Sequence, residues 1–203
     1  KKIDSTDFLD SIFVSKQKLF PTNDSPVTRS ELVDIINKLK QIVSEPNIDS
    51  LTRFLSYDVN LCQAIFNTLK ANHEFEFDDN EMREFITSLY NDIQPLILKL
   101  KFAYNRPRPN QLADSYDINL YPIPSKGIKS PSYPSGITIS AIVILEVLGN
   151  KHPKHYQYFK NFIDDVSISR VYLGHNYVSD IDYSFEIAKA IVTHKAITHK
   201  YKF

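Results

Sequence analysis

Apolar residues recur at intervals of three and four along most of the chain, which is the period of amphipathic α-helices. Thr28 and Glu31 have the spacing of a capping box, and Gly149 has the position of a C-terminal cap. Pro95 predicts a kink or break in the longest segment. The predicted helices cover about 28–44, 61–69, 79–104, 135–149, 154–166 and 179–192. Because no alternating strand pattern of useful length occurs, the sequence predicts an all-α fold, a helical bundle.

Composition adds few constraints on function. The chain is 42% apolar and 24% charged, which is typical of a soluble globular protein, and its length predicts one domain over residues 1–203. Lys and Arg number 24, as do Asp and Glu, so no overall field would recruit nucleic acid or an anionic membrane. The longest apolar stretch, 137–149, is shorter than the roughly 20 residues of a membrane span. We therefore expect a protein without a membrane span, in which any anion site is a local cluster.

The single cysteine, Cys62, excludes an internal disulfide framework and fits a reducing compartment. We expect it to be a structural thiol on an apolar helix face. The sequence therefore predicts a soluble, cytoplasmic protein, with a processed secreted form as the alternative.

Residues 105–134 lose the helical period and contain six of the eleven prolines. Long loops within compact domains are usually functional or disordered. We expect this loop to border a ligand site, with Tyr116, Tyr121 and Tyr133 either as ligand contacts or as structural residues.

Three separate segments carry groups that suit a phosphate. Lys99 and Arg106 are seven residues apart, which on a helix is close to two turns. Ser135 and Gly136 stand where a proline-bounded loop becomes a helix, and helix starts offer free N–H groups to anions. Arg170 has a planar fork that matches phosphate oxygens. Each feature alone also fits a solvated basic face or an ordinary N-cap, but together they predict one phosphate site.

In order and spacing, these segments resemble the motifs of the type 2 phosphatidic acid phosphatase superfamily, which includes bacterial non-specific acid phosphatases and vanadium haloperoxidases. Its first motif is a lysine, six intervening residues and Arg-Pro, which Lys99 and Arg106-Pro107 match. Its second is Pro-Ser-Gly-His, which residues 134–137 match except that Ile137 replaces the histidine.

The third motif of that superfamily is Ser-Arg, five residues, His, three residues, Asp. Ser169-Arg170 and Asp180 match it, but Asn176 stands at the histidine position. The resemblance covers about residues 80–195 and is strongest to the soluble phage and bacterial branch. It implies a helical bundle of the acid phosphatase type.

The resemblance also implies roles for these positions. In the family, the third-motif histidine attacks phosphorus while the aspartate holds its ring, and the second-motif histidine protonates the leaving group. Asn176 and Ile137 can do neither, because an amide is a weak nucleophile and isoleucine has no proton to give. The implied site keeps the phosphate-binding residues of the three motifs and Asp180 but lacks the two reacting groups. It needs no cofactor. Haloperoxidase activity is not expected, because the family binds vanadate through the histidine that is missing.

We therefore predict a protein that binds inorganic phosphate or a small phosphorylated molecule and has little or no phosphatase activity. One alternative is an active phosphomonoesterase, either with Asn176 engineered in place of a histidine or with His175 as nucleophile. On a helix, a one-residue offset turns His175 about 100° away from the direction of residue 176. Another alternative is a helical interaction protein without a ligand site. The other histidines lack the carboxylate or cysteine neighbours of a metal site, and the oligomeric state does not follow from the sequence.

Overall fold

The computed structural model describes residues 20–125 and 128–202, so residues 1–19 of the predicted domain lie outside the description. Within the described residues the secondary structure is helical and contains no strand, which confirms the all-α prediction. The α-helices are α2 (Pro26–Ile42), α3 (Ile48–Val59), α4 (Leu61–Ala71), α5 (Asp79–Tyr104), α6 (Pro109–Leu112), α7 (Gly136–Lys151), α8 (Tyr156–Tyr172), α9 (Val178–Val192) and α10 (Lys195–Tyr201). Short 3₁₀ turns are η1 (Glu45–Asn47), η2 (Ala113–Tyr116) and η3 (Pro153–His155).

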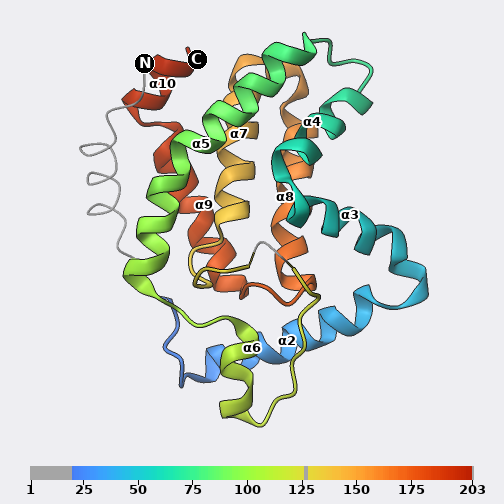
Figure 1. Ribbon diagram of the computed structural model, residues 1–203, viewed down its shortest axis with the longest axis vertical. Helices are drawn as coiled ribbons and strands as arrows, with labels where there is room; N and C mark the ends of the chain where they lie inside the picture. Colours follow the sequence, from blue (N-terminus) through green and yellow to red (C-terminus); the bar gives the residue numbers. More distant parts are fainter. Residues whose placement is uncertain (1–19, 126–127, 203) are drawn as a thin grey trace.

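Helix α7 forms the centre of the bundle, with α5, α8 and α9 packed around it (Figure 1). A helix that is apolar on all sides is a core helix, because it has no face suited to water. The buried apolar residues of α7 are Ile139, Ala141, Ile142, Val143, Ile144, Leu145, Val147 and Leu148. Its burial holds the first turn of α7 at a defined depth between the surrounding helices.

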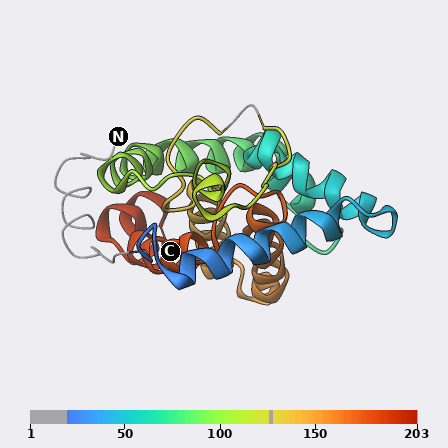
Figure 2. The same ribbon diagram turned by 90° about the horizontal axis from the view of Figure 1, so that it is seen from below.

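Helix α2 crosses one end of the bundle and packs against α8 (Figures 1 and 2). Leu32, Ile35 and Leu39 form a second apolar cluster there, which includes Val171 and Tyr177. This cluster anchors the turn between α8 and α9, the segment that carries the third motif.

The start of α2 differs from the predicted capping box at Thr28. Ser25 is the N-cap, and its side chain accepts a hydrogen bond from the Thr28 backbone N–H at 3.1 Å. Glu31 instead accepts from the backbone N–H of Ser179 at the start of α9, at 2.7 Å. The spacing that suggested a local cap therefore serves a tertiary contact.

Other helix boundaries also differ from the predictions. Helix α5 continues through Pro95 without a break. Helix α7 ends at Lys151, beyond the predicted cap at Gly149, where a Cβ would lie 2.7 Å from the Tyr156 ring. Gly149 is thus explained by close packing on α8 rather than by capping. Helices α3 and α10 were not predicted at all.

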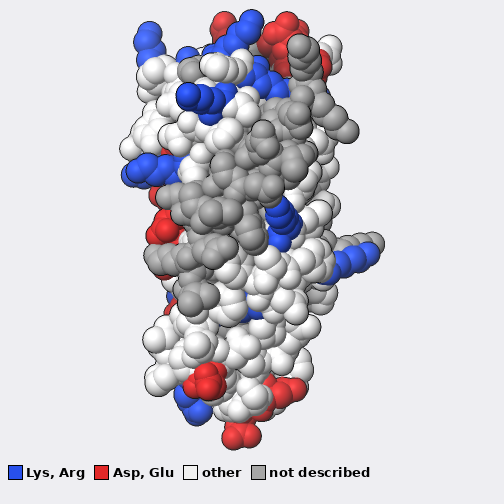
Figure 3. Space-filling model, turned by 90° about the vertical axis from the view of Figure 1, so that its left-hand side faces the viewer, with Lys and Arg blue, Asp and Glu red and all other residues white. Residues whose placement is uncertain are grey.

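No helix among the described residues is long and apolar enough to cross a membrane. On the face drawn in Figure 3, Lys and Arg occur in several separate groups, some of them beside Asp and Glu, and not in one broad basic area. Charge suited to an anion must therefore be sought in a local site.

Candidate anion-binding site

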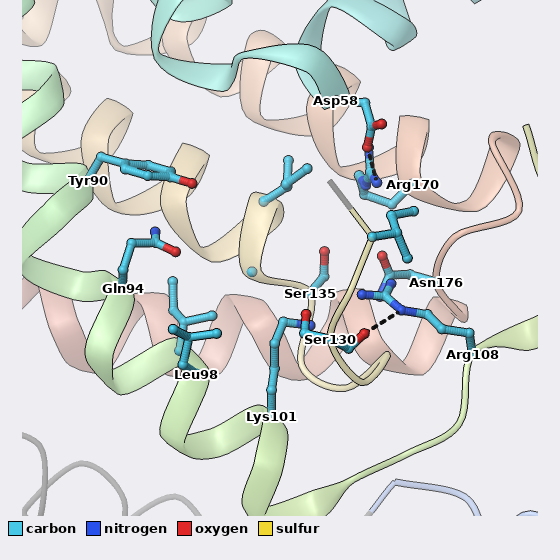
Figure 4. Close-up of a pocket in the computed structure, with 14 residues that line it drawn as sticks. Asp58, Tyr90, Gln94, Leu98, Lys101, Arg108, Ser130, Ser135, Arg170 and Asn176 are labelled. Atoms are coloured by element: carbon cyan, nitrogen blue, oxygen red, sulfur yellow. Dashed lines mark hydrogen bonds and ion pairs between the residues drawn. The ribbon is translucent and has the colours of Figure 1, made fainter. Parts of the chain in front are cut away.

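A cavity of about 190 Å³ opens between α5, the start of α7, the end of α8 and the loop before α7. Three cationic side chains line it, Lys101, Arg108 and Arg170, on the same side as Ser135 and Asn176 (Figure 4). Tyr90, Gln94 and Leu98 of α5 line the other side. The cavity thus has a cationic wall opposite a largely uncharged one.

Lys101 enters the cavity from the last turn of α5 and is only 5% exposed. Its Nζ donates to the carbonyl oxygens of Pro131 at 2.7 Å and Ser132 at 3.3 Å. Burial, reinforced by the charge of Arg108, lowers the pKa of Lys101 to about 7. An anion in the cavity would favour the charged form of this lysine.

Arg108 is held by the main chain on two sides. Its Nε donates to the Ser130 carbonyl at 2.9 Å, and its Nη1 donates to the His175 carbonyl at 2.7 Å. Burial lowers the pKa of Arg108 to about 10, so the guanidinium stays charged at neutral pH. These bonds fix the position of the guanidinium in the cavity wall.

Arg170, on the last turn of α8, is the most completely buried of the three cations that line the cavity, with 2% of its surface exposed. Its Nη2 donates to Asp58 Oδ1 at 2.7 Å and lies 2.8 Å from His175 Nδ1. Nε and Nη1 are buried and have no hydrogen-bond partner within the described part of the chain. Buried donors without an acceptor are rare and destabilising, so these two nitrogens are suited to receive an anion.

Asp58 brings a carboxylate to the same cavity from α3. Burial alone would raise the pKa of Asp58, but the charge of Arg170 and a hydrogen bond from Ser125 hold it below its ordinary value. Asp58 is therefore ionised at neutral pH. The three cations and this one carboxylate leave the cavity with a net positive charge.

The first turn of α7 closes the cavity from a further side. Ser135 is the N-cap, and Gly136 and Ile137 begin the helix, where N–H groups have no acceptor within the helix itself. A Cβ on Gly136 would lie 2.9 Å from Ile97 Cγ2 and 3.3 Å from Lys101 Cε. Glycine is thus needed for the close approach of α7 to α5. The side chain of Ile137 also lines the cavity, so the position of the family's second-motif histidine presents an apolar group.

Asn176 lines the cavity and is joined to Asp180 behind it. Its Nδ2 donates to the Ser132 carbonyl at 2.7 Å and to Asp180 Oδ2 at 3.2 Å. Asp180 Oδ2 also accepts from Ser132 Oγ at 2.5 Å and from the Tyr177 backbone N–H at 3.0 Å. The fully buried carboxylate therefore orients residue 176, whose amide lacks a strongly nucleophilic atom.

Lys99 and Arg106, predicted to bind phosphate, do not line this cavity. Lys99 is exposed on α5, two residues or about 200° around the helix from Lys101. Helix α5 ends at Tyr104, and Asn105 follows in the left-handed conformation (φ 48°). Arg106 therefore lies beyond the helix, whereas its spacing from Lys99 predicted that both would lie on one helix. Arg106 is fully buried beside Asp180 instead. The structure thus brings Ser135, Gly136 and Arg170 together at this cavity and places Lys99 and Arg106 outside it, unlike the predicted convergence of all five residues.

A signal for the pair that lines the cavity was present in the sequence. Lys101 is also separated by six residues from an Arg-Pro pair, Arg108-Pro109, so the first motif can be aligned in two ways two residues apart. The second alignment places both cations in the cavity. Asp58 had no such signal, because it lies outside the three motif segments.

His175, the alternative nucleophile, does not line the cavity. It is 2% exposed, with Nδ1 directed at Arg170 and Nε2 2.7 Å from the Ile123 carbonyl oxygen. Gly174 precedes it with a φ of +77°, and a Cβ there would lie 3.0 Å from Pro122 Cα. This turn directs the side chains of residues 175 and 176 to different surroundings.

The loop before α7 borders the cavity through Arg108, Ile128 and Ser130. The three candidate tyrosines do not line it. Tyr133 is buried in the core, Tyr121 is 81% exposed, and Tyr116 donates to the Asn23 carbonyl at 2.5 Å. The structural interpretation thus holds for Tyr116 and Tyr133. Within the described residues no cluster of His, Cys, Asp and Glu could hold a metal ion.

Comparison with known proteins identifies the fold. No family model matches the chain, and no curated protein matches it. Among solved structures it is similar to the first transmembrane PAP2 type phosphatidylglycerolphosphate phosphatase from Bacillus subtilis. The similarity has a TM-score of 0.56 at 16% identity and covers 91% of this chain and 89% of that one. The chain therefore has the fold of a PAP2-type phosphatase.

Proposed function

We propose that the cavity binds a phosphate group, either as inorganic phosphate or on a small phosphorylated molecule. The observation that carries this proposal is the buried guanidinium of Arg170, with Nε and Nη1 unpartnered within the described residues and Lys101 and Arg108 beside it. A phosphate has several acceptor oxygens and forms strong charge-assisted hydrogen bonds with guanidinium and ammonium groups. The N–H groups of Gly136 and Ile137, which have no acceptor within α7 itself, add donors of the kind that bind anions.

We further propose that the chain is a member of the type 2 phosphatidic acid phosphatase superfamily with impaired catalysis. The fold and the motif segments around the cavity support membership. Asn176 and Ile137, at the two histidine positions, support the loss of activity, because neither supplies a nucleophile or a proton at neutral pH. In this role the protein retains its ligand and hydrolyses phosphomonoesters slowly or not at all.

Isothermal titration calorimetry with inorganic phosphate tests the binding proposal. The wild-type chain should show one binding site, and Lys101→Met should weaken binding at least about tenfold, as expected for loss of a charged hydrogen bond. Lys99→Met is the matched control, since it removes the same charge from the same helix outside the cavity, and it should bind as the wild type does. Equal loss in both variants would reduce the effect to overall charge and contradict the proposed site.

A further inference from the structure

The turn at Gly174 buries His175 against Arg108 and Arg170, the two arginines that line the cavity. His175 contacts both of them: its ring Nδ1 lies 2.8 Å from Arg170 Nη2, and its carbonyl oxygen accepts from Arg108 Nη1 at 2.7 Å. The two arginines come from different segments of the chain, the end of α8 and the loop after α5. One residue outside the cavity thus touches two of its three cations.

The hydrogen-bond partners of the ring determine its tautomer. The Ile123 carbonyl oxygen, 2.7 Å from Nε2, can only accept, so Nε2 carries the proton. A guanidinium can only donate, so Nδ1 must present its lone pair to Arg170. Both bonds can form together only when the ring is neutral. Burial, and next the charge of Arg170, lowers the pKa of His175 to about 4, which keeps the ring neutral at physiological pH.

These bonds restrict how the Arg170 guanidinium can rotate. His175 Nδ1 and Asp58 Oδ1 both accept from the same nitrogen, Nη2, from two sides. With Nη2 held in this way, Nε and Nη1 remain the nitrogens without a partner within the described residues. Without the histidine acceptor, Arg170 would be free to turn further toward Asp58.

We propose that His175 is a positioning residue of the anion site, which holds Arg170 with Nε and Nη1 available to the ligand. This inference rests on the proposed anion-binding function and gives His175 a role other than nucleophile. Its lone pair is already engaged with Arg170, so the ring has no free nitrogen to attack phosphorus.

Two substitutions separate this role from a general effect on folding. In His175→Asn the amide oxygen stands at the same number of bonds from the backbone as Nδ1 and can accept from Arg170. In His175→Leu the side chain has a similar size and no acceptor. Both variants lose the Ile123 bond, and a cooperative thermal unfolding transition above the assay temperature would show that each remains folded.

Sulfate affinity, measured by calorimetry, should fall about tenfold or more in His175→Leu and remain within about threefold of wild type in His175→Asn. Wild-type affinity in the leucine variant would overturn the inference, as would an asparagine variant that is as weak as the leucine one. A wild-type chain that binds neither sulfate nor phosphate would refute the proposed function instead. Crystal structures of wild type and His175→Leu then decide the positioning role by itself, since an unchanged Arg170 side chain would refute it and a displaced one would support it.

Discussion

Arg106 and Asp180 form a fully buried ion pair, with 2.7 Å between Arg106 Nη1 and Asp180 Oδ1. The same guanidinium reaches Glu31 Oε2 at 3.2 Å and stacks on the Tyr177 ring with 3.8 Å from Cζ to the ring centroid. The arginine assigned to the phosphate from sequence therefore supports the carboxylate that orients Asn176. Its neighbour in the Arg-Pro-Arg-Pro repeat, Arg108, faces the cavity.

Arg106→Met should lower the stability of the fold, because Arg106 belongs to a buried ion pair and does not line the cavity. Removing one partner of a buried ion pair leaves an uncompensated charge and typically lowers the free energy of unfolding by about 3–5 kcal/mol. Urea denaturation measures this change. Arg108→Met is the matched comparison, and it should lose phosphate binding with a smaller loss of stability, because its partners are neutral carbonyl groups. A larger loss of unfolding free energy in Arg108→Met than in Arg106→Met would contradict the structural role of Arg106.

Anion affinity should fall as pH rises above neutrality. In the unliganded protein Lys101 has a pKa of about 7, so above that pH the binding of an anion requires the uptake of a proton by this lysine. Sulfate is a suitable probe, because its charge is constant over this range, unlike that of phosphate. Calorimetry from pH 6 to pH 9 should show constant affinity below about 7 and a decline above it. Lys101→Met should remove this decline in affinity. If affinity still declines with pH in the variant, another titrating group causes the decline.

Stability of the unliganded protein should show the opposite pH dependence. The pKa of Lys101 is about 7 in the folded chain and 10.5 as its ordinary value, so between these pH values the unfolded chain binds more protons. The free energy of unfolding of wild type should therefore rise relative to Lys101→Met from pH 7 to pH 9, by at most about 1.4 kcal/mol per pH unit. Denaturation in buffers without phosphate or sulfate measures the difference. A difference in unfolding free energy that stays constant with pH would show that burial does not lower the pKa of Lys101.

Introducing histidines at positions 176 and 137 should restore catalysis. Asn176→His should place a ring beside Asp180, which already accepts from residue 176, and should restore turnover of an activated aryl phosphate. Turnover of a nucleotide, which has a poorer leaving group, should need Ile137→His as well. Steady-state assays of wild type, both single variants and the double variant measure this. Robust activity of the wild-type chain would refute the impaired-enzyme proposal.

Much of the bundle was predictable because its helices have strong apolar periods. The central helix α7 and the long α5 follow directly from such patterns. Helix α3 was missed, although it supplies Asp58 to the cavity. Its buried residues include only Phe54 and Tyr57, too few to establish a period.

The site was only partly predictable for a different reason. Two lysines and two Arg-Pro pairs occur at the same spacing, and the choice between them depends on where α5 ends. Asn105 ends the helix in a left-handed conformation, a local C-cap, but which pair lines the cavity depends on how α5 packs against the start of α7, a tertiary feature. Glu31 shows the same limit, since its local capping pattern was overridden by the contact with Ser179.

A crystal structure of the wild-type chain soaked in tungstate tests the anion site most directly. Tungstate is a tetrahedral oxyanion like phosphate, and its anomalous signal locates it without ambiguity. We predict one strong peak between Lys101, Arg108 and Arg170, with oxygens within about 3 Å of Arg170 Nε and Nη1. A cavity that stays empty while tungstate binds at other places on the protein would contradict the account.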